Sequence, residues 1–213
     1  MEVVMNNNNL ENDFWRENVV SCALAYANHI WKPTIKNLFH GYDTDGILIN
    51  TPDSNYISAK YNCGWWIIEQ FNKGIPYNWG GCTTTIEEFD TRITEGKFAG
   101  NVPDSRDNGA SKYCVGVDCS GLVTICWSLT KRVSTRSVTN IASPLDSTDL
   151  LLPGDVILLS GSHVMIFINF LDNEKTCAKI VDSSRSTGRV LLRIENLSDL
   201  IKRGYRGYRK NIG

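Results

Sequence analysis

A cysteine at the start of an apolar helical pattern is the residue best placed for covalent chemistry in this chain of 213 residues. Cys119 follows Asp118 and opens a run that we expect to be helical over residues 119–130. Unpaired backbone N–H groups at a helix N-terminus favour negative charge, and therefore favour the thiolate form of a cysteine there. Because the thiolate is the attacking species, this position predicts a nucleophile for carbonyl carbons.

His163 is the candidate base for that nucleophile. It begins the apolar run 164–168 directly after the turn-forming residues 160–162, so its ring is expected to project from the start of a strand. A base in this position could pass the thiol proton on to a leaving amine. The alternative is a histidine that only caps the end of a strand.

Four short segments, taken together, resemble the signature segments of the NlpC family of papain-like cysteine peptidases. They occur in the family's order and span roughly residues 75–195. The resemblance implies an α+β, papain-like fold, with helices first and the nucleophile at a helix N-terminus packed on an antiparallel sheet of about five strands. The segments are Pro76-Tyr77-x-Trp79-Gly80-Gly81, Asp118-Cys119-Ser120-Gly121-Leu122-Val123, Leu152-Pro153-Gly154-Asp155-Val156 and His163-Val164-x-Ile166.

The same resemblance implies the catalytic residues. Cys119 matches the family's nucleophile and His163 its base, in agreement with the interpretation from the residues themselves. A third polar residue on the following strand orients the imidazole in this family, and Asp182 is its expected occupant here. Ser184 has the same strand parity and is the second candidate, whereas Ser183 should face the other way. Asp182 could instead be only a turn carboxylate.

The resemblance also implies substrate-binding residues. Tyr77 and Trp79 are expected at the substrate cleft, although core packing of the two rings is the alternative. Asp118 and Ser120 match positions that bind the free amino end of a peptide in relatives that cleave cell-wall peptides. Asp118 could equally be only the N-cap of the helix, a role that suits Asp without any substrate. The backbone N–H of Cys119 is a candidate oxyanion donor.

Hydrophobic periodicity predicts the remaining elements of one domain over residues 1–213. We expect residues 1–11 to be disordered, and 82–117 to form a long insertion that borders the cleft together with the hairpin between His163 and Asp182. Helices are predicted over residues 12–31 and 64–71, besides 119–130, and strands over 155–160, 163–170, 177–183, 188–194 and 205–210.

The seven cysteines are too few and too irregularly spaced for a disulfide scaffold, so we expect a reduced protein. Cys22 and Cys126 lie among apolar residues and are expected to act as small buried hydrophobes. Cys82 and Cys114 could pair in an oxidising compartment. His29 and His40 are not at metal-ligand spacing, so neither a metal nor a cofactor is expected.

Composition narrows the range of partners. The net charge is −1, without a long run of either sign, which argues against nucleic acid and anionic membranes. No apolar stretch is long enough for a transmembrane helix or a signal peptide, so we expect a soluble protein, cytoplasmic or exported with its signal removed.

The sequence therefore predicts a cysteine hydrolase that cleaves an amide bond through a thioester. By resemblance, the expected partner is a short peptide or a peptidoglycan fragment from the bacterial cell wall, cleaved between D-γ-glutamate and a diamino acid. Two alternatives remain open: an acyltransferase or amidase acting on another small molecule, and a binding module without turnover.

Overall fold

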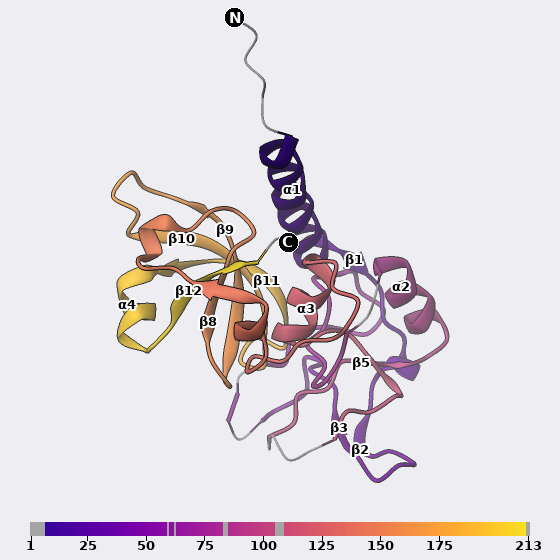
Figure 1. Ribbon diagram of the computed structural model, residues 1–213. Helices are drawn as coiled ribbons and strands as arrows, with labels where there is room; N and C mark the ends of the chain where they lie inside the picture. The colour runs from indigo at the N-terminus through magenta and orange to yellow at the C-terminus, as the bar shows by residue number, and fades with distance from the viewer. Residues whose placement is uncertain (1–6, 59, 62, 83–84, 105–108, 212–213) are drawn as a thin grey trace, which may run out of the picture.

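The computed structural model describes residues 7–58, 60–61, 63–82, 85–104 and 109–211. It has an α+β architecture, which confirms the α+β part of the predicted fold class. A large antiparallel sheet forms one half, short strands and loops form the other, and a central helix lies between them (Figure 1). The helices of the described residues are α1 (Asn7–Asn28), α2 (Ile86–Thr94), α3 (Cys119–Cys126) and α4 (Leu197–Lys202), with 3₁₀ turns η1 (Ile35–Asn37), η2 (Val138–Asn140) and η3 (Thr148–Leu150).

Within the described part of the chain the main sheet has six strands, in the order β11-β10-β9-β8-β12-β7, and all neighbours are antiparallel. About five were predicted. The additional strand is β7, whose Pro144 lies opposite Tyr208 at the edge of the sheet, where a residue without an N–H is tolerated. The strands are β7 (Ala142–Pro144), β8 (Val156–Leu159), β9 (His163–Phe170), β10 (Cys177–Ser184), β11 (Arg189–Asn196) and β12 (Arg206–Lys210).

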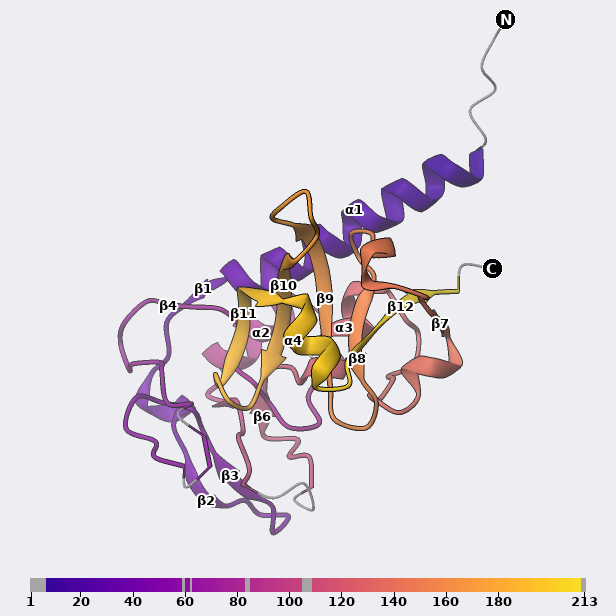
Figure 2. The same ribbon diagram turned by 90° about the vertical axis from the view of Figure 1, so that its left-hand side faces the viewer.

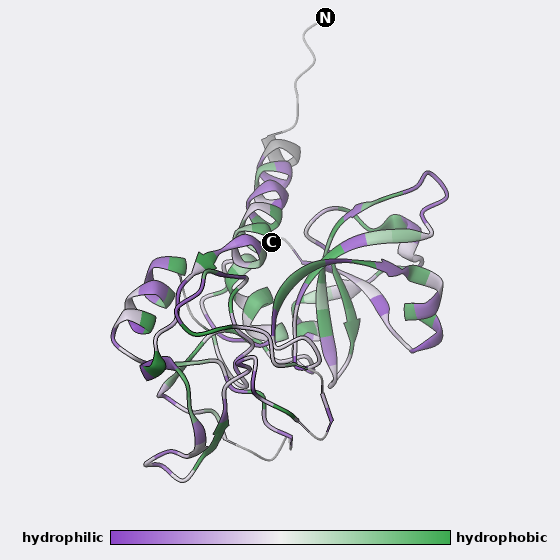
Figure 3. Ribbon diagram, turned by 180° about the vertical axis from the view of Figure 1, so that it is seen from behind, coloured by the Kyte–Doolittle hydropathy of each residue, from purple (hydrophilic) through white to green (hydrophobic). Residues whose placement is uncertain are grey.

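The two faces of this sheet bury alternate residues of each strand, as the period of two requires. Val164 and Ile166 of β9 belong to the core shared with α1 and α3, whereas Met165 and Phe167 belong to a second core that includes Leu200 of α4. Figure 2 shows α1 and α4 on opposite sides of the sheet, and Figure 3 shows how apolar residues dominate its strands. Strand parity therefore decides which helix a side chain meets.

The other half of the molecule is built from short strand pairs joined by loops. Among the described residues β1 pairs with β4, β2 pairs with β3, and β5 lies parallel to β6. The strands are β1 (Ile30–Trp31), β2 (His40–Tyr42), β3 (Leu48–Asn50), β4 (Asn72–Lys73), β5 (Phe98–Ala99) and β6 (Cys114–Val115).

Two predictions about elements in this half and at the N-terminus were wrong, and one helix was not predicted. Residues 64–71 are not helical, because the Asn72 side chain accepts from the Ile67 N–H and donates to its carbonyl, both at 3.0 Å. The helix that was not predicted is α2, within the insertion 82–117, where Thr85 caps it by accepting from Glu88 N at 2.9 Å. Residues 7–11, expected to be disordered, belong to α1, and residues 1–6 lie outside the described residues.

All seven cysteines are free thiols. Cys126 is buried near the end of α3, and its Sγ lies 3.0 Å from Sγ of the half-buried Cys22 on α1. Cys82 and Cys114 carry no disulfide either. In the described part of the chain, no helix combines the length and apolarity needed to cross a bilayer.

Candidate active site

The N-terminus of α3 is fixed by a capping residue and by a close backbone approach. Asp118 is the N-cap and accepts from the Gly121 N–H at 2.6 Å, so Cys119 becomes the first residue of the helix. A Cβ on Gly121 would lie 2.1 Å from the Gly81 carbonyl oxygen, and the Asp118 N–H donates to that same oxygen at 3.1 Å. Two of the sequence segments singled out above therefore meet at Cys119, the candidate nucleophile.

His163 and Asp182 come together through the register of the sheet. Ile180 of β10 is opposite Phe167 of β9, so Asp182 lies on the same face as His163, the first residue of β9. His163 Nε2 lies 2.5 Å from Oδ2 of Asp182. Ser184, the second candidate, instead contacts Ser186 at 2.8 Å.

The His163 ring also makes a hydrogen bond with the Cys119 side chain. Burial opposes a charge on His163, but the hydrogen bonds to Asp182 and to Cys119 outweigh it and raise the pKa to about 10. Burial likewise opposes the Asp182 charge, yet Arg193 and His163 lower the pKa of Asp182 to about 2. At neutral pH the site therefore holds an imidazolium between a carboxylate and the Cys119 sulfur.

Arg193 is a residue of this site that sequence reasoning missed. Its Nε donates to Asp182 Oδ1 and its Nη2 to Oδ2, each at 2.9 Å, in a two-pronged contact. Asp182 is almost fully buried and needs such a partner, because an isolated buried carboxylate is costly. Arg193 interrupts the apolar run of β11, and this was the sequence signal that could have indicated a buried partner. The strand pairing that brings Arg193 to Asp182, however, is a long-range contact.

A cleft of about 850 Å³ opens over the Cys119–His163 pair. The candidate residues Tyr77, Trp79 and Ser120 also line it. Further lining residues come from the loop after α3, from the β8–β9 and β10–β11 turns and from the segment after α4, and include Arg132, Ser134, Gly161, Arg185 and Arg203.

The predicted border of this cleft needs a correction. None of the described residues between 82 and 117 lines it, and neither does any residue from 164 to 183. Arg92 of α2 instead donates to the Cys114 carbonyl at 3.1 Å, and Phe89 of the same helix lies in the main core. The insertion thus supports the scaffold, and shorter turns border the cleft.

The carboxylate of Asp118 is already occupied. Besides Gly121, it accepts from the Ser120 hydroxyl at 3.0 Å, from the Gly80 N–H at 3.1 Å and from the guanidinium of Arg132. Arg132 thus already supplies a cationic partner to this carboxylate. This geometry favours the capping role that was left open for Asp118 and argues against the ammonium-binding role.

Tyr77 and Trp79 differ in how they meet the cleft. Tyr77 is buried, and burial, followed by the charges of Asp118 and Cys119, raises its pKa well above the ordinary value. Its phenol therefore remains neutral near Cys119. Trp79 is only partly buried, and the Arg185 guanidinium lies 5.3 Å from the centre of its ring.

The other two histidines have carboxylate partners outside the cleft. His29 Nε2 lies 2.7 Å from Asp90, and His40 Nε2 lies 2.7 Å from Asp53. Within the residues that the structure describes, no group of three His, Cys, Asp or Glu side chains could hold a metal ion.

Comparison with known proteins adds no relative to this description. No protein-family model, curated protein or solved structure matches the chain. An assignment of function for this chain therefore depends on its own residues and their geometry.

Proposed function

We propose that this chain is a cysteine hydrolase that cleaves amide bonds, with Cys119 as nucleophile, His163 as acid and base, and Asp182 as the residue that orients the imidazole. One observation carries the proposal. A thiol at the first position of α3 hydrogen-bonds a histidine whose other ring nitrogen is held by a buried carboxylate. A nucleophile, a base and an orienting group in this order are the components that acyl transfer requires.

In the proposed reaction, the Cys119 thiolate attacks the amide carbon and the negative charge moves onto the carbonyl oxygen. The backbone N–H of Cys119, at the start of α3, is the proposed donor to that oxygen, since helix-start N–H groups have no partner within the helix. The His163 imidazolium then protonates the departing amine. Water, deprotonated by the neutral imidazole, hydrolyses the thioester and restores the thiol.

The resemblance to the NlpC family gives the proposal a fold relationship and a substrate class. Three of its four segments border the cleft, and the fourth, residues 152–156, joins α3 to the sheet. There the Trp127 indole donates to the Gly154 carbonyl at 2.9 Å, and the Gly154 N–H donates to Phe167. We propose a papain-like arrangement and, as substrate, a short cell-wall-type peptide with a D-γ-glutamyl bond to a diamino acid.

The direct test is mass spectrometry of peptidoglycan fragments incubated with the purified protein. The proposal expects peptides cut between D-glutamate and the diamino acid, with the masses of the two products adding up to that of the precursor plus one water. Cys119→Ser should reduce the rate by about 10⁴-fold or more while the protein stays folded, because a hydroxyl is far less ionised than a thiol.

Two results would contradict this proposal. One is unchanged fragments across peptides of different length and amidation, and the other is cleavage that survives in Cys119→Ser. Cleavage at a different amide, still dependent on Cys119, would retain the mechanism and reject the substrate.

A further inference from the structure

The side chains that line the cleft carry a strong excess of positive charge. Four arginines reach it, and Asp118 is the one carboxylate among the described residues that line it. Clefts lined by one sign of charge attract ligands of the opposite sign. The four arginines are Arg132, Arg185, Arg193 and Arg203.

Two of these arginines already have carboxylate partners. Arg132 pairs with Asp118, and Arg193 pairs with both Asp182 and Glu195. Within the part of the chain that the structure describes, neither Arg185 nor Arg203 has a carboxylate within ion-pair distance. Of these two, Arg203 is exposed, whereas Arg185 is partly buried at the turn between β10 and β11.

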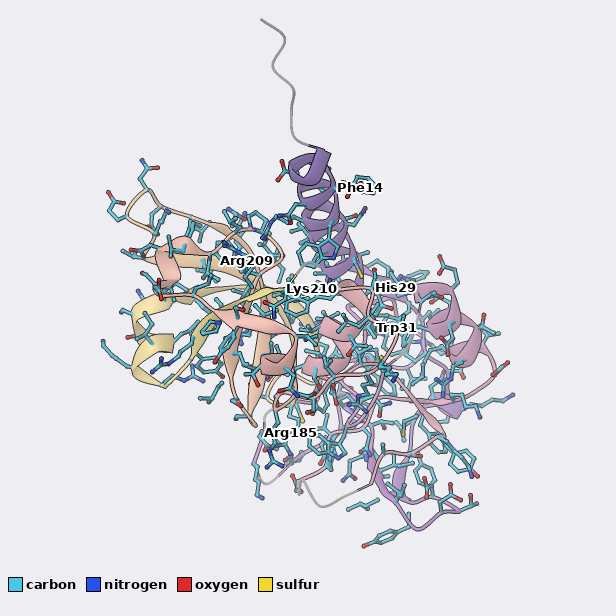
Figure 4. All side chains as sticks on the ribbon, in the orientation of Figure 1. Phe14, His29, Trp31, Arg185, Arg209 and Lys210 are labelled. Atoms are coloured by element: carbon cyan, nitrogen blue, oxygen red, sulfur yellow. The ribbon has the colours of Figure 1, made fainter. Side chains whose placement is uncertain are left out.

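Arg185 is held in position by aromatic rings. Its guanidinium lies 5.2 Å from the centre of the Tyr61 ring and 5.3 Å from that of Trp79, and its Nη1 donates to the Pro103 carbonyl at 3.3 Å. In Figure 4, Arg185 lies at the junction between the sheet and the loop-rich half of the molecule. A guanidinium held over aromatic faces can still use the N–H groups on its edge for a planar anion.

Two hydroxyl groups lie on either side of Arg185 along the chain. Ser184 and Ser186 both line the cleft, and their oxygens are 2.8 Å apart. One hydroxyl hydrogen is used between them, so the other is available to a ligand. This turn follows directly on the strand that carries Asp182, which ties it to the catalytic side of the cleft.

We propose that Arg185, with Ser184 and Ser186, binds a carboxylate of the substrate, so that the cleft selects amide substrates that carry a free acid group near the bond to be cleaved. The assignment rests on the proposed hydrolase function and names the substrate class of the same site. It also replaces the expected ammonium pocket, because Arg132 already neutralises Asp118.

The test compares two synthetic peptides that differ in one group: L-Ala-γ-D-Glu-diaminopimelate and the same peptide with the glutamate α-carboxylate converted to the carboxamide. Wild-type protein should cleave the acid with a kcat/KM about tenfold or more above that of the amide, since hydrogen bonds to charged groups contribute most. Arg185→Gln should bring the two values within about twofold, and Arg185→Lys should keep part of the preference.

A matched control removes one positive charge far from the cleft. Lys36 is exposed on η1, and Lys36→Gln should retain the full preference for the acid. Equal cleavage of acid and amide by the wild-type protein, or a preference unchanged in both Arg185 variants, would overturn the carboxylate site.

A binding measurement separates this inference from the proposed function. Calorimetry with Cys119→Ala, which cannot turn over, should show tighter binding of the acid than of the amide. Selective binding of the acid without any cleavage by the wild-type protein would reject the hydrolase and keep the carboxylate site. Cleavage of both peptides without selectivity would keep the hydrolase and reject the carboxylate site. Binding of neither peptide to Cys119→Ala would also overturn the carboxylate site.

Discussion

The two ends of α3 carry cysteines with very different surroundings. Cys119 begins the helix, lines the cleft and hydrogen-bonds His163. Cys126 ends the same helix, is buried in the core and lies 3.0 Å from the sulfur of Cys22. Six residues of one helix thus separate a thiol next to an imidazolium from a thiol next to another thiol.

The difference is one of electrostatics. Burial, followed by the contact with Cys22, raises the pKa of Cys126 well above the ordinary value, so that thiol stays neutral. Cys119 lies at the helix end where backbone N–H groups point outward, and an imidazolium is its partner. Residue type therefore says little about thiol chemistry here, and the position on the helix says a great deal.

Among variants that retain Cys119 and His163, the largest effect on activity should come from Asp182→Asn, which removes the carboxylate beside the partner of Cys119 but keeps the shape of the side chain. We expect kcat/KM to fall by about 10²-fold, because the imidazole loses both its orienting partner and the group that stabilises its charge. The rate should be measured on the peptide that the wild-type protein cleaves best, and circular dichroism would verify the fold.

The same variant should shift the pH dependence. The pKa of His163 is raised to about 10, so the imidazolium that is proposed to protonate the leaving amine is present below that pH and lost above it. Without the Asp182 carboxylate this pKa must fall, and the upper limb of the kcat/KM profile should move to lower pH. An upper limb at the same pH in both proteins would show that Asp182 does not act through the imidazole.

A smaller effect is expected at the other end of the helix. Cys126→Ala removes a buried sulfur that packs against Cys22, so the free energy of unfolding should fall by about 1 kcal/mol. Activity should remain within about twofold, because Cys126 lies outside the cleft lining. Urea unfolding and kcat/KM together measure both quantities, and a loss of activity without a loss of stability would contradict the division between the two cysteines.

Much of the sheet, and the contact between Cys119 and His163, could be predicted from the sequence, because short local patterns mark the strands and both residues. The β9 strand was predicted with its observed bounds, since a continuous apolar run between turn residues is a strong strand signal. The resemblance implied Asp182 as the third residue, and strand parity predicted that Ser183 faces the other way; Ser183 does so, donating to the Val117 carbonyl at 2.7 Å.

The predictions that differ from the structure have two kinds of physical cause. Residues 64–71 contain an apolar run too short to distinguish helix from loop, and the Asn72 side chain takes the backbone hydrogen bonds that a helix would have made. Helix α2, in contrast, could have been predicted, because Thr85 and Glu88 have the spacing of a capping box.

The second kind of cause is long-range contact, and it applies to the arginine partners of Asp182 and Asp118. Arg193 reaches Asp182 through strand pairing, and Arg132 reaches Asp118 through the loop that follows α3. Neither contact leaves a short-range signature in the sequence. The expected ammonium-binding role of Asp118 came from the resemblance, and none of the matching segments contains Arg132. The sequence therefore offered no reason to prefer the capping role over the binding role.

Alkylation of the seven cysteines by iodoacetamide at neutral pH, followed by peptide mapping, tests the central claim most directly. Only 9% of Cys119 is exposed, whereas Cys22, Cys82 and Cys177 are more exposed, so exposure alone predicts that these three react first. The proposed thiolate–imidazolium pair predicts that Cys119 reacts fastest of all and that His163→Ala removes the advantage. If Cys119 reacts no faster than these three cysteines, or equally fast without His163, the pair is not the nucleophilic centre of this protein.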